Sequence, residues 1–418
     1  MSRMDFSDTE REATFRAEAR RWLEGEAEPL AAGESRPTLY DWRRRPRALE
    51  QAKEWMLRKA QARWACLTWP KEFGGRAASR IEQAIWDQEE ARFRTPPNMF
   101  TIGQGMLGPA IMEHGTAAQR ERYLGPILQG AEVWCQLFSE PAAGSDLAGL
   151  NTRATREGDD WIIEGQKIWT SGAQYCDFGM LLARTSPENP KHHGITYFIV
   201  DMRTAGIEVR PIRQMNGTSG FNEVFFSQVR VPDRNRVGPV DEGWRGALTT
   251  LMHERQTLSG GASGPGFAEV FALARESRWR GRSALRDPYV RDSLADMHIR
   301  LKGIEYARYR SLSALSRGAA PGAESSIGKL VGAQLRQQIA SFALELLGPG
   351  ASSLSVEDSP LGALFADAYL AAPGARIAGG TDEVLRNIVA ERILGLPPEP
   401  RLDKKIPYSE IPTGRVLD

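Results

Sequence analysis

Apolar residues recur at helical spacing near the start of the chain. Phe15, Ala19 and Leu23 share one face of a segment that is otherwise rich in charge, and the same period returns over 55–62 and 80–93. A 3.6-residue period among charged positions is typical of amphipathic helices. The pattern therefore predicts a helical N-terminal region.

The pattern changes between about Trp134 and Val231. Short runs rich in β-branched and aromatic residues are separated there by Gly, Pro, Asn or Asp, which is typical of strands joined by turns. The runs are WIIEG, FGMLLAR, ITYFIV, IEVRPI and NEVFFSQVRV. They predict an antiparallel β domain of roughly 100 residues.

The helical period returns after the β-rich region. A wide apolar stripe runs from Ile327 to Leu347 and is closed by Gly348, which predicts a helix that is buried on more than one side. A last helix is expected to start near Thr381, a candidate N-cap followed by two acidic residues, and to stop at Gly395.

The order α, β, α indicates an α+β protein. We expect an N-terminal α-helical domain over 1–132, a middle antiparallel β domain of barrel form over 133–240, and a C-terminal four-helix bundle over 241–395. Residues 396–418 are rich in proline and charge. We expect them to form an extended tail that packs on a neighbour or is partly disordered.

Composition and charge narrow the classes of function. Hydrophobic residues make up 41% and charged residues 26% of the 418 residues, and 54 Lys+Arg against 53 Asp+Glu leave a formal charge of +1. Such a balance attracts neither nucleic acid nor an anionic membrane. The widely spaced Cys66, Cys135 and Cys176 favour reduced thiols over a disulfide scaffold. With no apolar signal core and no stretch near the ~18 residues of a membrane span, we expect a cytoplasmic protein.

Several familiar catalytic motifs are absent from the sequence. There is no G-x-S-x-G elbow, Walker loop or H-E-x-x-H, and no G-x-G-x-x-G that opens a βαβ unit. The five histidines have no ligand spacing, so we expect no metal site. The stretch GGASGPG at 260–266 favours close helix packing over a phosphate cradle.

Glu254 occupies an unusual position in LMHERQTLSGG, residues 251–261. Ala247, Leu251, Glu254 and Leu258 share one helix face, and the other three are apolar. A carboxylate buried there needs a cation such as Arg255, or its pKa is raised, as suits a general base. The alternative is a partly exposed glutamate at the edge of the stripe.

Two further segments contain small hydroxyl side chains and an indole. QLFSEPAAGSDLAGL, 136–150, supplies Ser139 and a Gly-Ser corner at Ser145, and EGQKIWTSG, 164–172, sets Trp169 beside two hydroxyls. Hydroxyls and backbone N–H groups suit the edge of a flat heterocycle, and an indole can cover its face. The alternative is a core Trp169 with hydroxyls that satisfy turns.

These residues carry a family resemblance. The sequence resembles the acyl-CoA dehydrogenases, flavoproteins that oxidise acyl-CoA thioesters at the α and β carbons. The matching segments are F-S-E-P-x-A-G-S-D at 138–146, G-x-K-x-W-x-S at 165–171, IAGGTDEVLRNIVAERILGLP at 377–397 and LTWPKEFGG at 67–75. The similarity covers about residues 5–398, and the α, β, α order is also the family's architecture.

The resemblance implies FAD as cofactor, an electron-transfer flavoprotein as electron acceptor, acyl-CoA as substrate, and a homotetramer or dimer. It places Phe138 and Ser139 along the flavin ring, with Ser139 donating to its edge. Trp169 and Ser171 are expected to cover and hold the ring. Ser145 is expected to border the acyl-CoA channel. Carried over in the same way, Thr381 and Glu383 contact FAD near the start of the last helix.

The resemblance also bears on the base. Many family members use a glutamate just before the Gly-Thr of the C-terminal segment, but this chain has Gly379 there. A second branch, which includes isovaleryl and long-chain enzymes, places the base on the helix after the β domain beside an arginine, a position that falls on Glu254 and Arg255. Gly379 can still offer its backbone N–H to the thioester carbonyl. Ala378 and Gly380 border the same pocket. Ala378, where many relatives carry an aromatic residue, together with Gly379 would leave this end of the pocket wider, which hints at branched or bulky acyl groups.

The chain departs from the family pattern in two FAD segments. An arginine followed by Phe-Gly is replaced by ESRWRGRSALRDP, 276–288, where Arg278, Arg280 or Arg282 could substitute. The Gln-x-x-Gly-Gly element appears as ELLGPGA, with Glu345 and Pro349.

Two alternatives therefore stay open. One is a flavin-dependent oxygenase or oxidase on the same fold, and the other is a non-catalytic partner subunit of a hetero-oligomer. The sequence does not specify acyl length, pathway, or whether the carrier is CoA or an acyl-carrier protein.

Overall fold

The computed structural model describes residues 8–31, 47–258, 264–316, 325–352 and 359–412. They form two compact units, which are described separately. The helical unit comprises Met1–Thr38, Ser79–Thr95 and Leu258–Pro398, and the mixed unit comprises Leu39–Ala78, Pro96–Thr257 and Glu399–Asp418. Among the described residues, no helix is long and apolar enough to cross a membrane.

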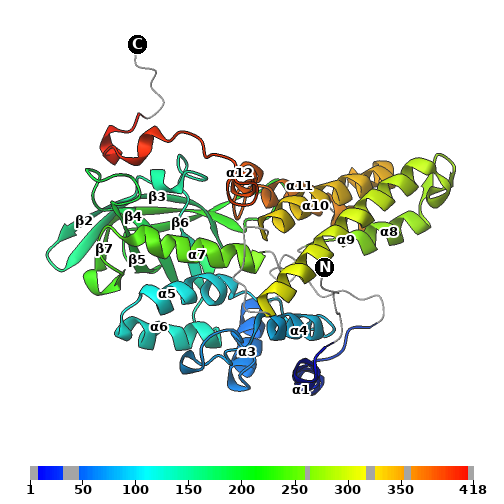
Figure 1. Cartoon of the computed structure of the whole chain (residues 1–418), viewed down its shortest axis with the longest axis horizontal. Coiled ribbons are helices and arrows are strands. Elements are labelled where there is room, and N and C mark those ends of the chain that lie inside the picture. The colour runs from blue at the N-terminus through cyan, green and yellow to red at the C-terminus, as the bar shows by residue number, and fades with distance from the viewer. Residues whose placement is uncertain (1–7, 32–46, 259–263, 317–324, 353–358, 413–418) are drawn as a thin grey trace, which may run out of the picture. The chain divides into compact units, whose positions relative to one another are not determined.

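The helical unit combines helices from both ends of the sequence (Figure 1). Its helices are α1 (Glu10–Glu26), α4 (Arg80–Glu90), α8 (Phe267–Glu276), α9 (Pro288–Ser316), α10 (Ser325–Leu347), α11 (Pro360–Ala375) and α12 (Asp382–Arg392), and β9 (Arg278–Trp279) pairs with β10 (Arg282–Ser283). Helices α8 to α11 share one core, to which Leu335, Phe342 and Phe365 contribute. The helix predicted over the 327–347 stripe is thus confirmed, and Thr381 caps α12 as predicted.

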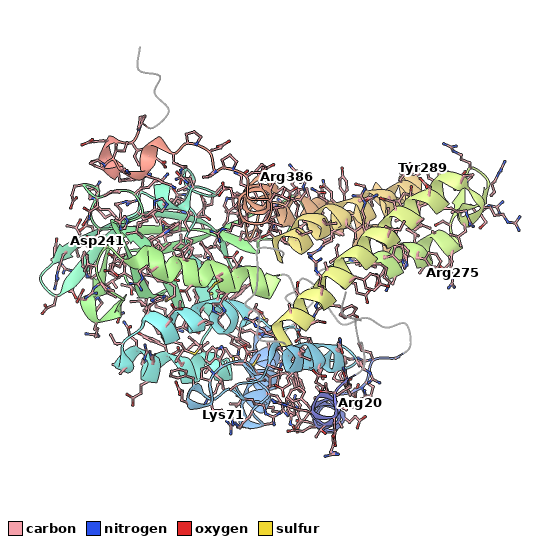
Figure 2. The ribbon with its side chains drawn as sticks, viewed as in Figure 1. Arg20, Lys71, Asp241, Arg275, Tyr289 and Arg386 are labelled. Carbon is pink, nitrogen blue, oxygen red and sulfur yellow. The ribbon has the colours of Figure 1, made fainter. Side chains whose placement is uncertain are left out.

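A buried acid joins α1 to α4. The carboxylate of Glu89, 2% exposed, accepts hydrogen bonds from Arg16 at 3.0 Å, from Arg20 at 2.9 and 3.0 Å, and from Arg92 at 3.1 Å; Arg20 is labelled in Figure 2. Burial alone raises the pKa of Glu89, but the hydrogen bonds from Arg20 and Arg16 outweigh burial and lower the pKa to about 2. The ionised form therefore stabilises this helix pair.

The mixed unit contains a sheet and its covering helices. The helices are α3 (Ala48–Gln61), the π-helical turn η2 (Gly103–Leu107), α5 (Gly108–His114), α6 (Ala117–Gln129) and α7 (Gly243–Leu258). The strands are β1 (Trp134–Leu137), β2 (Arg153–Glu157), β3 (Asp160–Ser171), β4 (Phe178–Arg184), β5 (Ile195–Asp201), β6 (Ile207–Ile212), β7 (Phe221–Pro232) and β8 (Arg236–Val237). Their order is β6-β7-β3-β2-β4-β5-β8, with β1 on β4. Most neighbours are antiparallel, as predicted, but β1 and β2 run parallel to β4.

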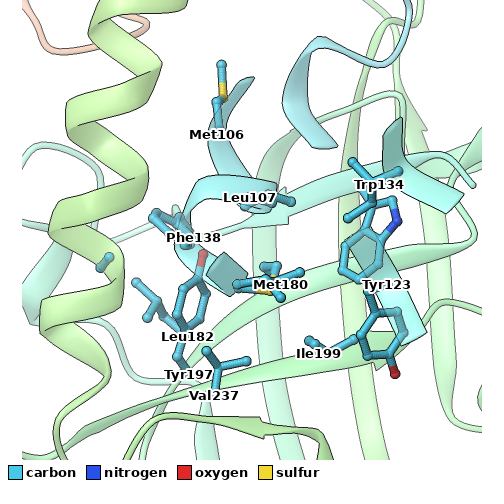
Figure 3. Close-up of a cluster of buried hydrophobic side chains, with 14 of the residues drawn as sticks. Met106, Leu107, Tyr123, Trp134, Phe138, Met180, Leu182, Tyr197, Ile199 and Val237 are labelled. Atoms are coloured by element: carbon cyan, nitrogen blue, oxygen red, sulfur yellow. The ribbon is translucent and has the colours of Figure 1, made fainter. Parts of the chain in front are cut away.

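Strands β4 and β5 lie between two cores. On β5, Tyr197 and Ile199 belong to one cluster of buried side chains, whereas Phe198 and Val200 belong to another. Successive side chains of a strand point to opposite faces, so a strand buried on both faces reads as a continuous apolar run. Figure 3 shows the first cluster, in which the rings of Phe138 and Tyr197 lie next to each other.

Helix α7 packs on the first cluster through small and hydroxyl residues. A Cβ on Gly246 would lie 2.6 Å from the Tyr197 ring, so only glycine allows this approach. The Tyr197 hydroxyl lies 3.0 Å from Thr250 Oγ1, and His114 Nε2 lies 2.8 Å from Thr249 Oγ1. These contacts fix how α7 is rotated, and with it the face that presents Glu254.

The described part of the C-terminal tail packs on the mixed unit. The described part of the tail from residue 399 onward belongs to the mixed unit, and Pro407 forms a β-bridge with Pro190 of the same chain. Tyr408 N donates to Asn189 O at 2.8 Å and Ser409 N donates to Pro187 O at 2.9 Å. Thus the described part of the segment packs on its own β domain, and packing on a neighbour stays a prediction.

Replacing Glu89 by Gln should destabilise the protein in a pH-dependent way. Loss of a buried charge partner typically costs about 3–5 kcal/mol. Because the folded-state pKa of Glu89 lies below its ordinary value of 4.5, the stabilisation is fully present above about pH 4.5 and disappears as pH falls toward 2. Urea unfolding from pH 7 to pH 3 measures the difference between Glu89→Gln and wild type, which should narrow in acid. The exposed Glu24 on α1 gives the control Glu24→Gln, and a gap that stays constant with pH would contradict the assignment.

Candidate active site

Glu254 is half-buried on α7 within the mixed unit. Gln136 Nε2, from β1, donates to Glu254 Oε2 at 3.3 Å. Burial raises the pKa of Tyr197, and the negative charge of Glu254 adds to that effect. Glu254 therefore lies beside β1, and its partner Gln136 precedes Phe138 by two residues. The side chain of Arg255, the predicted cationic neighbour, lies outside what the structure describes.

Phe138 and Ser139 follow β1 and are attached to β3 by main-chain contacts. Ile168 N donates to Ser139 O at 2.9 Å, and Lys167 Nζ donates to Phe138 O at 3.0 Å. Phe138 is buried and packs edge-on against Tyr197, with ring centroids 5.7 Å apart. The two motif segments, distant in sequence, thus meet at this edge.

A buried ion pair joins the same two segments. Lys167 Nζ lies 2.7 Å from Glu140 Oε1, and Lys167 is fully buried. The Glu140 carboxylate also accepts from Asn151 N at 2.6 Å and Thr152 N at 2.9 Å. Burial lowers the pKa of Lys167 to about 8. Burial by itself raises the pKa of Glu140, but the charge of Lys167 and the hydrogen-bond donors outweigh this effect, so the pKa of Glu140 lies below its ordinary value. The sequence interpretation missed this pair, although its signal was present, because the first motif carries the acids Glu140 and Asp146 and the second carries Lys167.

Trp169 is an exposed aromatic residue on a strand. Its side chain is 56% exposed, its φ is +60°, and β3 shifts register on β7 between Lys167 and Thr170. A bulge of this kind re-aims a side chain, and a non-glycine residue at positive φ is typical of functional sites. The ring meets Phe221 edge-on at 6.0 Å. Trp169 is therefore not the core residue of the alternative interpretation.

The helical unit holds the other set of predicted residues. Lys329 Nζ donates to Gly380 O at 2.5 Å, and Thr381 Oγ1 accepts from Val384 N at 3.2 Å. Gly379 and Gly380 have φ values of +65° and +95°, which favour glycine. Within the described chain, the N–H of Gly379 has no acceptor. Ala378 and Glu383 are exposed beside this turn.

Asp382 is a further residue that the sequence interpretation missed. It is 1% exposed and pairs with Arg376 at 2.7 Å while accepting from Gln334 at 3.2 Å. Burial raises the pKa of Asp382, but the hydrogen bonds from Arg376 and Gln334 outweigh burial and lower it. The ion pair closes the turn that carries Gly379.

The arginine-rich segment forms the β9–β10 hairpin of the helical unit. Arg278 Nη2 donates to Gly281 O at 2.7 Å, so this side chain closes its own turn. Arg280 has a φ of +49° and lies over the Trp279 ring at 5.8 Å. Trp279 in turn stacks on Tyr289 of α9. The hairpin is thus anchored to α9, whereas the Gly379 turn is anchored to α10.

Ser145 is exposed at an open hollow of about 370 Å³ in the mixed unit. The hollow is lined by Ser145, Asp146, Lys191, Arg401 and Asp403. Elsewhere, no group of three or more His, Cys, Asp or Glu side chains in the described chain is arranged to hold a metal ion.

The chain belongs to the acyl-CoA dehydrogenase family. It matches the family's N-terminal domain over residues 9–131, its middle domain over 135–229 and its C-terminal domain over 241–394. The α+β fold expected from the sequence is thereby confirmed, and so are a flavoprotein oxidoreductase acting on CH–CH donors and FAD as the family's cofactor.

Sequence similarity to known proteins extends over most of the chain. The acyl-CoA dehydrogenase IpdE1 of Mycobacterium tuberculosis is 36% identical over 390 residues, which cover 92% of this chain and 98% of IpdE1. FadE34 of the same organism is 41% identical over 332 residues, but these span only 44% of FadE34 and 79% of this chain.

Solved structures show the same fold. The "Tcur3481-Tcur3483 steroid ACAD" is 30% identical with a TM-score of 0.76, and 95% of this chain covers 100% of that one. The ChsE4-ChsE5 complex from Mycobacterium tuberculosis is 29% identical with a TM-score of 0.74 and the same coverage.

The residues present fit a bound flavin. The exposed Trp169 indole offers a flat apolar surface, and the half-buried Ser139 and Ser171 carry hydroxyls that are potential donors. Thr170 Oγ1 is buried without a hydrogen-bond partner in the described chain. An aromatic surface with unsatisfied polar groups beside it suits a heterocycle that has an apolar face and a polar edge.

Breaking the ion pair from one side should cost more than removing both of its charges. Lys167→Met leaves Glu140 buried and ionised, for which we expect a loss of about 3–5 kcal/mol in unfolding free energy, whereas Lys167→Met with Glu140→Gln should recover part of the loss. Urea unfolding of the two single variants and the double variant gives the coupling energy. The exposed pair of Arg210 and Glu208 supplies the control Glu208→Gln, which should leave the midpoint unchanged. Strictly additive losses at Glu140 and Lys167 would contradict a coupled pair.

Proposed function

We propose that the protein catalyses the α,β-dehydrogenation of an acyl-CoA thioester to a trans-2-enoyl-CoA, with Glu254 as the base that removes the α-proton. The observation that supports this role is a half-buried carboxylate on α7, hydrogen-bonded to Gln136 of the strand that leads into Phe138 and Ser139. A carboxylate is the kind of group that can accept a carbon-bound proton once the developing charge is stabilised elsewhere.

Other residues of the chain are proposed to bind and orient. Gly379 donates its N–H to the thioester carbonyl, which stabilises the enolate-like charge as the proton leaves. Arg255, Ala378, Gly380 and Ser145 border the acyl thioester. FAD, when bound, supplies the acceptor for the β-hydride at N5.

The FAD contacts are proposed from both sets of residues. Phe138, Ser139, Trp169 and Ser171 hold the ring, and Thr381 and Glu383 contact FAD near α12. Arg278 and Arg280 meet the anionic part of the FAD of a neighbouring subunit. Arg280 is the stronger candidate of the two arginines, since Arg278 already donates within its hairpin.

For the substrate, we propose an acyl group with a bulky ring, with a steroid-derived acyl chain as the leading candidate. Ala378, Gly379 and Gly380 together present a single methyl group as side chain, which leaves space for a large acyl group. A similar solved protein is described as a steroid acyl-CoA dehydrogenase. Electron-transfer flavoprotein is the proposed acceptor of the electrons.

Anaerobic reduction of the bound flavin tests the base and the substrate class together. Short, branched, long and ring-bearing acyl-CoAs are mixed with wild type, and we expect bleaching to be fastest with the ring-bearing thioesters. Glu254→Gln should slow bleaching by at least ~100-fold, because a general base typically contributes 10²–10⁴ in rate. The control is Glu242→Gln, which changes an exposed acid just before α7 and should bleach normally.

Three outcomes of this experiment would redirect the proposal. If Glu254→Gln bleached like wild type, the glutamate would be structural. If no thioester bleached wild type, the non-catalytic partner would be favoured. If flavin reduced by other donors then consumed oxygen rapidly, the oxygenase or oxidase would be favoured.

We propose that the chain assembles through the helical unit with a second chain of its own family. Large apolar side chains are exposed on its helices, among them Ile299 and Tyr306 of α9 and Tyr369 of α11, which are 68%, 50% and 43% exposed. Exposed apolar side chains gathered on long helices are typical of protein interfaces. Two similar solved structures are described by paired names, Tcur3481-Tcur3483 and ChsE4-ChsE5, which makes a related second polypeptide a candidate beside a second copy.

Introducing charge on α9 should therefore break the assembly. Ile299→Glu with Tyr306→Glu is expected to lower the native mass to that of a single chain, measured by light scattering. Leu57 on α3 of the mixed unit is 42% exposed, and Leu57→Glu should leave the mass unchanged. The FAD content of the chain purified alone distinguishes the two partners. One FAD per chain indicates that the chain assembles with copies of itself, and less than one FAD per chain indicates that a second polypeptide is missing. A wild-type chain that is monomeric alone and with related subunits would refute the proposal.

A further inference from the structure

The C-terminal segment lies directly on the part of the mixed unit that carries Ser145. Arg184 of β4 is 3% exposed and donates to Lys191 O at 2.7 Å and to Ala148 O at 2.6 Å. Its guanidinium lies 3.8 Å from the centre of the Tyr408 ring. Burial lowers the pKa of Arg184 to about 10, which leaves it charged near neutral pH. The ring of Tyr408 thus covers a buried cation.

Tyr408 also binds the backbone that follows Ser145. Its hydroxyl lies 3.0 Å from Gly149 O and 2.7 Å from Asn151 Oδ1, and its single proton can be donated to either acceptor. Asn151 N in turn donates to the carboxylate of Glu140. The tail is therefore connected through Asn151 to the ion pair that fixes Phe138 and Ser139.

The tail supplies two of the five residues that line the hollow beside Ser145. Arg401 Nε donates to Asp403 Oδ1 at 3.0 Å, and Lys191 forms ion pairs with Asp403 and, at 2.9 Å, with Asp146. Two cations and two carboxylates surround the Ser145 hydroxyl, so the formal charges cancel. The lining offers both donors and acceptors and no apolar side chain.

This lining selects for one chemical class of ligand. The lining exposes polar and apolar surface in similar amounts, the apolar part coming from side-chain stems, so a wholly apolar acyl group would bury charged groups without gaining a hydrogen bond. A polyphosphate would meet the carboxylates of Asp146 and Asp403 as well as the cations. A neutral chain with amide and hydroxyl groups can pair with donors and acceptors of both kinds. The pantetheine arm of an acyl thioester has this chemistry, and it is common to CoA and to acyl-carrier proteins.

We propose that the docked C-terminal segment forms one wall of a pantetheine-binding hollow, with Arg401 and Asp403 as binding residues opposite Ser145. The proposal rests on the proposed function, since it takes an acyl thioester as substrate. It assigns a binding role to residues that lie beyond the part of the chain that matches the family, which ends at residue 394.

Three thioesters of the same acyl group, which contain successively less of the CoA molecule, show which part of the carrier the hollow binds. They are the CoA, pantetheine and N-acetylcysteamine thioesters, assayed by dye reduction on wild type, on Arg401→Ala with Asp403→Ala, and on Lys404→Ala, a control at an exposed neighbour. We expect the double variant to raise KM about tenfold for the CoA and pantetheine thioesters, with kcat little changed, and to leave KM for the N-acetylcysteamine thioester within about twofold. Arg401→Lys should recover part of the affinity.

Other outcomes would overturn the proposal. Unchanged KM for all three thioesters would remove the tail from substrate binding, and a rise confined to the CoA thioester would indicate that the hollow binds phosphate instead. A similar rise for all three would indicate a general structural effect. Calorimetric binding of S-methylpantetheine to wild type and to the double variant needs no turnover, so it tests the hollow even if the wild type oxidises no thioester, in which case the proposed function alone fails.

Discussion

The buried ion pair between Lys167 and Glu140 is the interaction on which the mixed unit's candidate site depends. A lysine that is 0% exposed is costly unless its charge is paired. The pair is complete only when the segment after β1, the segment before β2 and strand β3 all come together, because Glu140 accepts from Asn151 and Thr152 as well as from Lys167. Because the buried charge of Lys167 is stabilised only in this arrangement, the ion pair fixes the three segments relative to one another.

From that point the position of the aromatic residues follows. Lys167 Nζ donates a hydrogen bond to Phe138 O, and Ile168 N donates one to Ser139 O. These bonds attach the chain after β1 to β3 just before the bulge. The bulge turns Trp169 outward with a left-handed backbone. Since strain of this kind persists only where the surroundings over-determine it, the rigid contacts at Phe138 and Ser139 explain how an exposed indole can be held there.

Local pattern was enough to predict much of the fold, because period and capping are short-range properties. The α10 stripe, the Thr381 cap and the β-rich runs each lie within one element. The Lys167–Glu140 pair, the exposure of Trp169 and the docking of Tyr408 on Arg184 depend on segments that meet only in the folded chain. The opposite charges in the two motifs did not by themselves show that Lys167 pairs with Glu140. The Pro-rich, charged sequence of the tail likewise did not indicate the contact of Tyr408 with Arg184. Glu254 could be singled out from spacing, but its hydrogen bond with Gln136 could not.

The conformation of Gly379 supports the proposal that the base lies on another element. Its φ of +65° disfavours any residue with a side chain, and Lys329 and the Arg376–Asp382 pair hold the turn in this form. A carboxylate at this position would require either strain or a different turn. What the turn retains is an N–H without an acceptor among the described residues, and a donor of that kind can stabilise developing negative charge but cannot take a proton. In the proposed mechanism, proton removal therefore requires a carboxylate from elsewhere in the chain, and Glu254 of α7 is the residue proposed for this role.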